Sequence, residues 1–91
     1  MTKLEAEAML THVQGWTLAS DAKKISKQFK FKDFVAAMDF ANKITLIAET
    51  EGHHPDLSIS WGKVEVVLTT HAVKGLSQND FILAAKIDQI S

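Results

Sequence analysis

The clearest pattern of apolar and polar residues follows Pro55. Apolar side chains occupy odd positions in the segment 57–61 and even positions in the segment 64–68. Within one straight strand, this change of parity would turn half of the apolar side chains toward water. A two-residue loop at Gly62-Lys63 removes the conflict, because glycine in the first loop position suits a type II′ hairpin turn. The predicted hairpin pairs Trp61 with Val64, Ile59 with Val66, and Leu57 with Leu68.

The N-terminal part of the chain predicts a short helix and two strands. A capping-box pattern at Thr2–Glu5 opens a helix that should end near Val13. A short strand is predicted at Trp16–Leu18. Apolar and polar residues then alternate over Ile25–Phe31, which indicates a half-buried strand, and only Lys27 breaks the alternation.

A long helix should follow these strands. Asp33 is a suitable N-cap, and Gly52 with Pro55 should end the helix near Glu51, because glycine is favoured just after a helix and proline prevents its resumption. Three- and four-residue spacing marks one apolar face of this helix. The residues on that face are Phe34, Ala37, Met38, Ala41, Ile44, Thr45 and Ala48.

The last helix opens at the capping-box-like segment Ser77–Asp80, and Leu83, Ile87 and Ile90 give it a buried stripe. The order of elements is therefore α-β-β-α-β-β-α. This order predicts an α+β fold, a four-stranded antiparallel sheet with three helices packed on one face. We expect residues 1–91 to form a single domain, because two cores would each be too small to offset chain entropy.

The composition narrows the class of protein. With 46 % apolar and 23 % charged residues, the chain is close to an average globular domain. It has no cysteine, so neither disulfides nor thiolate zinc sites can hold the fold. A net charge of −1 disfavours direct nucleic-acid binding, and the sequence predicts neither a signal peptide nor a membrane span. We expect a cytoplasmic protein with no membrane contact.

The predicted hairpin gathers histidines. Continuing its register brings His54 opposite His71, and a slip of one residue would bring His53 there instead. An imidazole can donate or accept a proton near neutral pH, because its reference pKa is about 6.5. Histidines around one pocket can therefore protonate a leaving group and remove a proton elsewhere, as a dehydration requires. His12 is explained as a surface residue at a helix end.

Two other interpretations of these residues stay open. His53 and His54 could be solvated loop residues with no catalytic part. A metal site could use His54 and His71 with Glu49 or Asp80, although the chain has neither His-x₃-His nor His-Glu-x-x-His, which would be stronger signs of zinc. By local context alone, Glu49 is a solvated helix residue and Asp80 is a helix cap.

One combination of residues is specific to a known family, above all a His-His-Pro sequence followed later by Thr-His. The residues of this combination are Glu49, His53-His54-Pro55, Trp61, Lys63-Val64, Val66, Leu68, Thr70-His71, Gly75-Leu76-Ser77, Asp80 and Leu83-Ala84. Together they resemble the signature of the pterin-4a-carbinolamine dehydratases. The resemblance extends from Trp16 through Ile87.

This resemblance implies a hydro-lyase with neither cofactor nor metal. The family dehydrates 4a-hydroxytetrahydropterin to quinonoid dihydropterin and so serves tetrahydrobiopterin recycling. The implied catalytic residues are His53, His54 and His71, with Glu49 and Asp80 as supporting acids. The implied substrate contacts are His53, His54, Pro55, Thr70, His71, and the backbone of Ala72 and Val73. A homodimer or a homotetramer is the implied assembly.

Two positions depart from the family's usual pattern. Asp56-Leu57 stands where many members have an aromatic residue, which could loosen the pocket wall or change the preferred pterin. Gly62 replaces an asparagine before Lys63-Val64, a change expected to affect only the turn.

Three competing functions remain open. Animal members of the family also act as dimerisation partners of a transcription factor through their helical face, so a non-catalytic binding module is one. A pterin role in molybdopterin metabolism is another, because it would use the same pocket residues. The third is a metal-dependent hydrolase built on the histidines.

Overall fold

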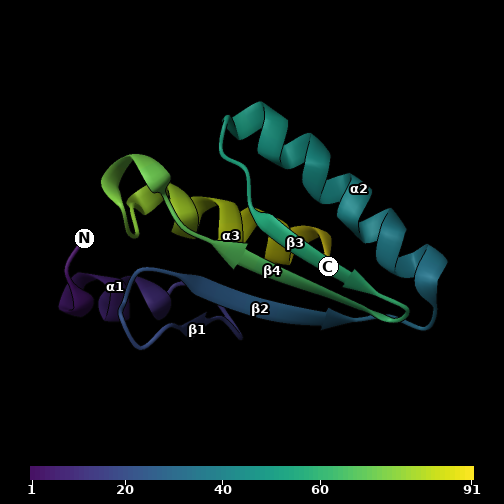
Figure 1. The fold of residues 1–91 in the computed structure, drawn as a ribbon, viewed down its shortest axis with the longest axis horizontal. Coiled ribbons are helices and arrows are strands. Elements are labelled where there is room, and N and C mark those ends of the chain that lie inside the picture. Colours follow the sequence, from purple (N-terminus) through teal and green to yellow (C-terminus); the bar gives the residue numbers. More distant parts are fainter.

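The computed structural model describes residues 1–91, and its helices and strands follow the predicted order (Figure 1). A 3₁₀ turn, η1, is added between the last strand and the last helix. The elements are α1 (Lys3–Leu10), β1 (Thr17–Leu18), β2 (Ile25–Lys30), α2 (Phe34–Glu51), β3 (Asp56–Ser60), β4 (Lys63–Leu68), η1 (His71–Val73) and α3 (Gln78–Ile90).

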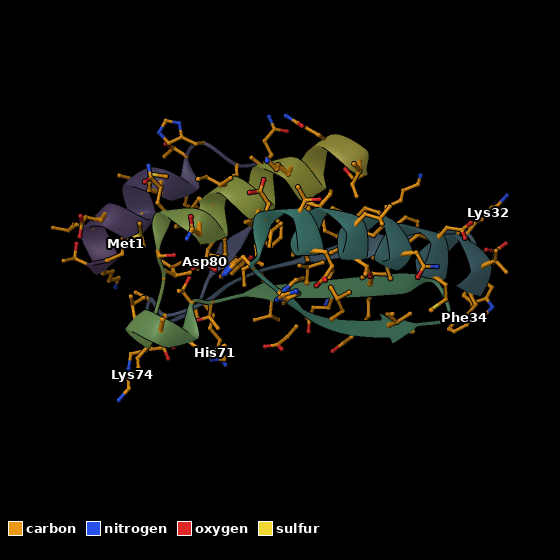
Figure 2. All side chains as sticks on the ribbon, turned by 90° about the horizontal axis from the view of Figure 1, so that it is seen from above. Met1, Lys32, Phe34, His71, Lys74 and Asp80 are labelled. Atoms are coloured by element: carbon orange, nitrogen blue, oxygen red, sulfur yellow. The ribbon has the colours of Figure 1, made fainter.

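The four strands form one antiparallel sheet in the order β1-β2-β4-β3, so β3 is an edge strand. Figure 2 shows α1, α2 and α3 on the same side of this sheet, which confirms the predicted α+β fold. The core lies between the two layers, where side chains of β2 and β4 meet those of the helices. Its fully buried strand residues are Ile25, Val64, Val66 and Leu68.

The hairpin forms, but its predicted register is wrong. Ile59 lies opposite Val64 and not Val66, so the pairing is displaced by two residues, and the loop is Trp61-Gly62. Gly62 does not have the positive φ expected of a turn glycine. It is tied instead to the end of β2, because its carbonyl accepts the amide of Phe31 at 2.8 Å and a Cβ on Gly62 would lie 2.8 Å from the carbonyl oxygen of Phe31.

The observed register leaves both His54 and His71 outside the ladder. A displacement of two residues keeps Leu57 and the apolar residues of β4 on their predicted face, because side chains alternate with a period of two. Trp61 instead lies in the loop and is exposed. The displacement does not keep His54 opposite His71. The β3–β4 ladder extends from the pair Asp56–Val67 to the pair Ser60–Lys63, so neither histidine belongs to it. Any proximity of the histidines must come from the loops beyond the ladder.

Lys27, which interrupts the alternation of β2, points toward the helices and has polar partners there. Its ammonium donates to the carbonyl of Gln14 at 2.7 Å and to a carboxylate oxygen of Asp88 at 2.8 Å. Trp16, which is buried, donates its indole N–H to the same carboxylate at 3.0 Å. The ammonium group of Lys27 therefore links β2 to the C-terminal end of α3.

The buried face of α2 differs in part from the predicted one. Ala37, Ala41, Ile44 and Ala48 are buried as expected, and so is Phe40, which the spacing did not single out. Phe40 contacts two aromatic rings at the end of β2, with ring centroids 4.7 Å from Phe29 and 5.0 Å from Phe31. Phe34, predicted to face inward, is 49 % exposed. None of the helices, α2 included, has the length and apolar character needed to cross a membrane.

Candidate active site

The segment with the two adjacent histidines begins where α2 ends. Gly52 adopts a left-handed conformation with φ of 64°, which glycine tolerates without strain, and it ends the helix as predicted. The amide of His53 then donates to the carbonyl of Ala48 at 3.1 Å. This bond holds the backbone of His53, two residues past the end of α2, against the last turn of the helix.

The side chain of His53 contacts Asp80, in the first turn of α3. Its carboxylate is fully buried, and Oδ1 lies 2.6 Å from Nε2 of His53. Oδ2 accepts the hydroxyl of Thr70 at 2.7 Å and the backbone amide of Ser77 at 2.9 Å. The bond to Ser77 is the helix cap that the sequence indicated. The bonds to His53 and Thr70 are additional, and they join three separate segments of the chain.

Thr70 opens a small closed loop that carries η1. Its amide donates to the carbonyl of Gly75 at 2.8 Å, and its own carbonyl accepts the amides of Val73 at 3.1 Å and Gly75 at 3.3 Å. The η1 residues, His71 among them, are exposed. In Figure 2, His71 lies on the lower side of the molecule, away from the helices, whereas Asp80 lies in the helical layer.

His54 has different surroundings from His53. Its Nε2 is hydrogen-bonded to a carboxylate oxygen of Glu49, which lies one turn back along α2. Both side chains are exposed, His54 at 63 % and Glu49 at 69 %. His54 also borders a small cavity of about 130 Å³ beside Pro55 and Leu57. Each of the two adjacent histidines thus has its own carboxylate partner, one buried and one in solvent.

The structure therefore brings some of the predicted residues together and separates others. His53 and Thr70 meet through Asp80, and His71 is the next residue after Thr70. Of the three histidines, only His54 lines one of the cavities, so the gathering of the three imidazoles around one pterin stays a prediction. The largest cavity, about 590 Å³, lies beside η1 against α1 and includes Val73 and Ser77 in its walls.

The alternative metal site is not assembled. No group of three or more histidine, aspartate or glutamate side chains lies close enough to hold a metal ion. Glu49 pairs with His54 and Asp80 pairs with His53, and these two pairs do not converge.

Sequence reasoning missed one member of the cluster around Asp80. The hydroxyl of Ser77 lies 2.7 Å from that of Thr70, so Ser77 touches the cluster through its side chain as well as its backbone. The signal was present in the Ser-x-x-Asp pattern at the start of α3. That pattern shows where a helix begins, but it does not show what else a buried cap can bind.

Comparisons with known proteins agree on one family. The model of the Pterin 4 alpha carbinolamine dehydratase family matches residues 1–90. A Methylococcus capsulatus protein provisionally named pterin-4-alpha-carbinolamine dehydratase is 46 % identical over 91 residues, which cover all of this chain and 80 % of the relative. A Halorhodospira halophila protein with the same provisional name is 47 % identical over 90 residues, covering 99 % of this chain and 83 % of the relative.

Two solved structures share the fold. A crystal structure from Brucella melitensis, described as a transcriptional coactivator/pterin dehydratase, has a TM-score of 0.92 and 33 % identity and covers 99 % of this chain and 96 % of that one. A pterin dehydratase-like protein described as a RuBisCO assembly factor in the alpha-carboxysome has a TM-score of 0.72 over 87 % of this chain and 92 % of that one. At 19 % identity, this second likeness concerns the fold alone.

Proposed function

Because this chain belongs to the pterin-4-alpha-carbinolamine dehydratase family of hydro-lyases, we propose that it dehydrates 4a-hydroxytetrahydropterin to quinonoid dihydropterin by histidine acid–base catalysis. The observation that carries this proposal is the contact between His53 and the buried carboxylate of Asp80, which also binds Thr70, the residue before His71. An oriented imidazole and an exposed imidazole on adjoining loops can serve as the two proton carriers of a dehydration.

The proposed reaction moves two protons. The N5 lone pair of the pterin forms a double bond to C4a and expels the C4a hydroxyl. One imidazolium protonates that hydroxyl, which leaves as water, and a neutral imidazole takes the proton of N5. Exchange with solvent restores both rings. We assign His53 and His71 to this acid–base pair and His54 to holding the pterin, with Glu49 as the partner of His54.

The proposed substrate contacts lie on the two adjoining loops. They comprise the His53-His54-Pro55 segment and η1, whose three residues, His71, Ala72 and Val73, are exposed and therefore reachable. Thr70 is a weaker candidate for a direct contact, because its amide, carbonyl and hydroxyl already bind within the protein.

A turnover assay tests this proposal. The purified chain is mixed with freshly generated 4a-hydroxytetrahydropterin, and quinonoid dihydropterin is followed by absorbance. His71→Ala should lower kcat by about 10²-fold or more, the usual worth of a general acid or base, while circular dichroism shows a folded protein. His12→Ala, on the surface near the end of α1, is the matched control. Wild-type kcat in His71→Ala would remove His71 from the mechanism.

A protein-binding role is a second candidate. The Brucella melitensis structure carries both descriptions, coactivator and dehydratase. In this chain, α2 also exposes large apolar side chains, with Val35 at 67 % and Leu46 at 71 %. Charged substitutions such as Leu46→Glu should abolish partner binding or self-association and leave dehydration intact.

We also propose that the chain forms a homodimer or a homotetramer. The edge strand β3 has no neighbour on its outer side, and pairing with a second copy would satisfy its free backbone groups. Sedimentation velocity measures the mass directly, and a monomer at micromolar concentration would contradict the proposal.

A further inference from the structure

We propose that Ser77, Thr70 and Asp80 form a hydrogen-bond relay that keeps the proton of neutral His53 on Nε2, and so leaves Nδ1 as the atom that acts on a substrate. The inference deepens the proposed function and rests on it. It gives Thr70 and Ser77 a positioning role in place of substrate contact, and it assigns the reactive nitrogen of His53.

The protons of the relay can be assigned from its donors. Thr70 has one hydroxyl proton, and it donates that proton to Oδ2 of Asp80 at 2.7 Å. In the 2.7 Å contact between the hydroxyls of Thr70 and Ser77, the donor must then be Ser77. The hydroxyl protons therefore point in one direction, from Ser77 to Thr70 and from Thr70 to Asp80.

The position of the His53 proton follows from the same count of donors and acceptors. Oδ2 of Asp80 already accepts the Thr70 hydroxyl and the Ser77 amide, an arrangement suited to an ionised carboxylate. An ionised carboxylate can only accept hydrogen bonds. The contact of 2.6 Å between Oδ1 and Nε2 of His53 therefore requires the proton on Nε2. In neutral His53 the lone pair is then on Nδ1.

Nδ1 of His53 is the nitrogen that a ligand can reach. It has no hydrogen-bond partner within the protein, whereas Nε2 is occupied by Asp80. No buried side-chain nitrogen or oxygen of the chain lacks a partner, so an unpaired Nδ1 must reach the surface. The His53 side chain is 15 % exposed, which leaves a small opening on an otherwise enclosed ring.

The surroundings of Thr70 support a positioning role. Its hydroxyl, amide and carbonyl bind Asp80, Gly75 and Val73, so no donor remains for a ligand. Thr70 and Asp80 also join the loop that carries His71 to the helix that orients His53. In Figure 2, Asp80 lies in the helical layer and His71 lies below it, and the hydrogen bond of Thr70 to Asp80 links the two regions.

The tautomer of His53 can be measured without any assay of activity. In ¹⁵N-labelled protein above the titration range of histidine, long-range ¹H–¹⁵N spectra should show a protonated Nε2 and a bare Nδ1 for His53. Thr70→Val removes one of the two donors that hold Oδ2 and keeps the shape of the side chain. The carboxylate should then turn part of the time away from Nε2, and a second tautomer of His53 should appear beside the first. Thr70→Ser should restore the wild-type spectrum. A wild-type His53 with its proton on Nδ1 would overturn the inference.

Kinetics then separate positioning from substrate binding. Thr70→Val should lower kcat about tenfold, as expected for losing one hydrogen bond to a charged group, with KM changed by less than about twofold. Thr70→Ser should recover most of that loss. A raised KM with unchanged kcat would make Thr70 a substrate ligand and overturn the positioning role. If the wild type shows no dehydratase activity, the proposed function fails, and the tautomer spectrum still decides the relay.

Discussion

Two helices of this protein begin with the same local pattern, but only one of the two beginnings belongs to the candidate site. At α1, Thr2 and Glu5 bind each other's backbone amides, and both residues are exposed. At α3, Asp80 also reaches back to the amide of Ser77, but its side chain is fully buried and its other oxygen binds His53. Both helices therefore begin with the same capping box, but only at α3 does the capping acid have a second oxygen that is buried and binds another segment.

This difference predicts which of the two acids, Glu5 or Asp80, is more costly to replace. Water can replace any hydrogen bond that the exposed Glu5 makes, so its loss leaves no group without a partner. Asp80 has no such substitute, because the groups around it would be left unpaired in a dry environment. The same arrangement that makes Asp80 costly to remove also fixes His53 in one orientation.

Asp80→Asn should show this difference most strongly. An amide presents an N–H₂ on one side, which must oppose either the donors on Oδ2 or the ring of His53. We expect kcat to fall by about 10²-fold or more through loss of the His53 tautomer. The free energy of unfolding should fall by about 1–3 kcal/mol, measured by urea denaturation. Glu5→Gln, the same change in the exposed cap, is the control and should keep wild-type kcat. Equal kcat for both variants would reduce Asp80 to a cap.

The two caps also show how far the sequence alone could go. Helix starts, the end of α2 at Gly52 and the buried face of β4 depend on residues a few positions apart, and they are confirmed. The structure places Gly62 against the carbonyl of Phe31, beyond the end of β2, and His53 against Asp80, 27 residues away. Contacts across such distances leave no local pattern, so spacing could not predict them.

Asp88, at the other end of α3, offers a comparison within one helix. Its carboxylate also binds two separate segments, through Lys27 and the indole of Trp16, but it touches no histidine. Asp88→Asn should lower the free energy of unfolding by about 1–2 kcal/mol and leave kcat per folded molecule unchanged. Asp39→Asn, on the exposed face of α2, is the control for charge and should change neither quantity. A fall in kcat would extend the site along the whole of α3.

The exposed pair of Glu49 and His54 should be less sensitive than the buried pair of Asp80 and His53. Both of its side chains are mostly in water, where an ion pair contributes about 0–1 kcal/mol. Glu49→Gln should therefore change the free energy of unfolding by less than about 0.5 kcal/mol, and 0.5 M salt should reduce the difference further. Its effect on kcat should remain well below that of Asp80→Asn. A larger loss of activity would mean that Glu49, and not Asp80, orients the principal proton carrier.

The smallest effect should come from the cap of α1, and it should depend on pH. The hydrogen bond from the backbone amide of Thr2, and then the one from its hydroxyl, hold the pKa of Glu5 below its ordinary value of 4.5. Because the pKa is lower in the folded state, the stabilisation is present above the unfolded-state pKa and is lost as the pH falls through the folded-state pKa. Thr2→Ala should move the midpoint of Glu5, followed by NMR of its carboxyl carbon, upward toward 4.5, since the side-chain contribution of Thr2 to the lowered pKa is lost. Thr2→Ser should move it back. An unchanged midpoint in Thr2→Ala would leave the backbone amide alone responsible for the shift, and the exposed cap would then share even less with the side-chain relay around Asp80.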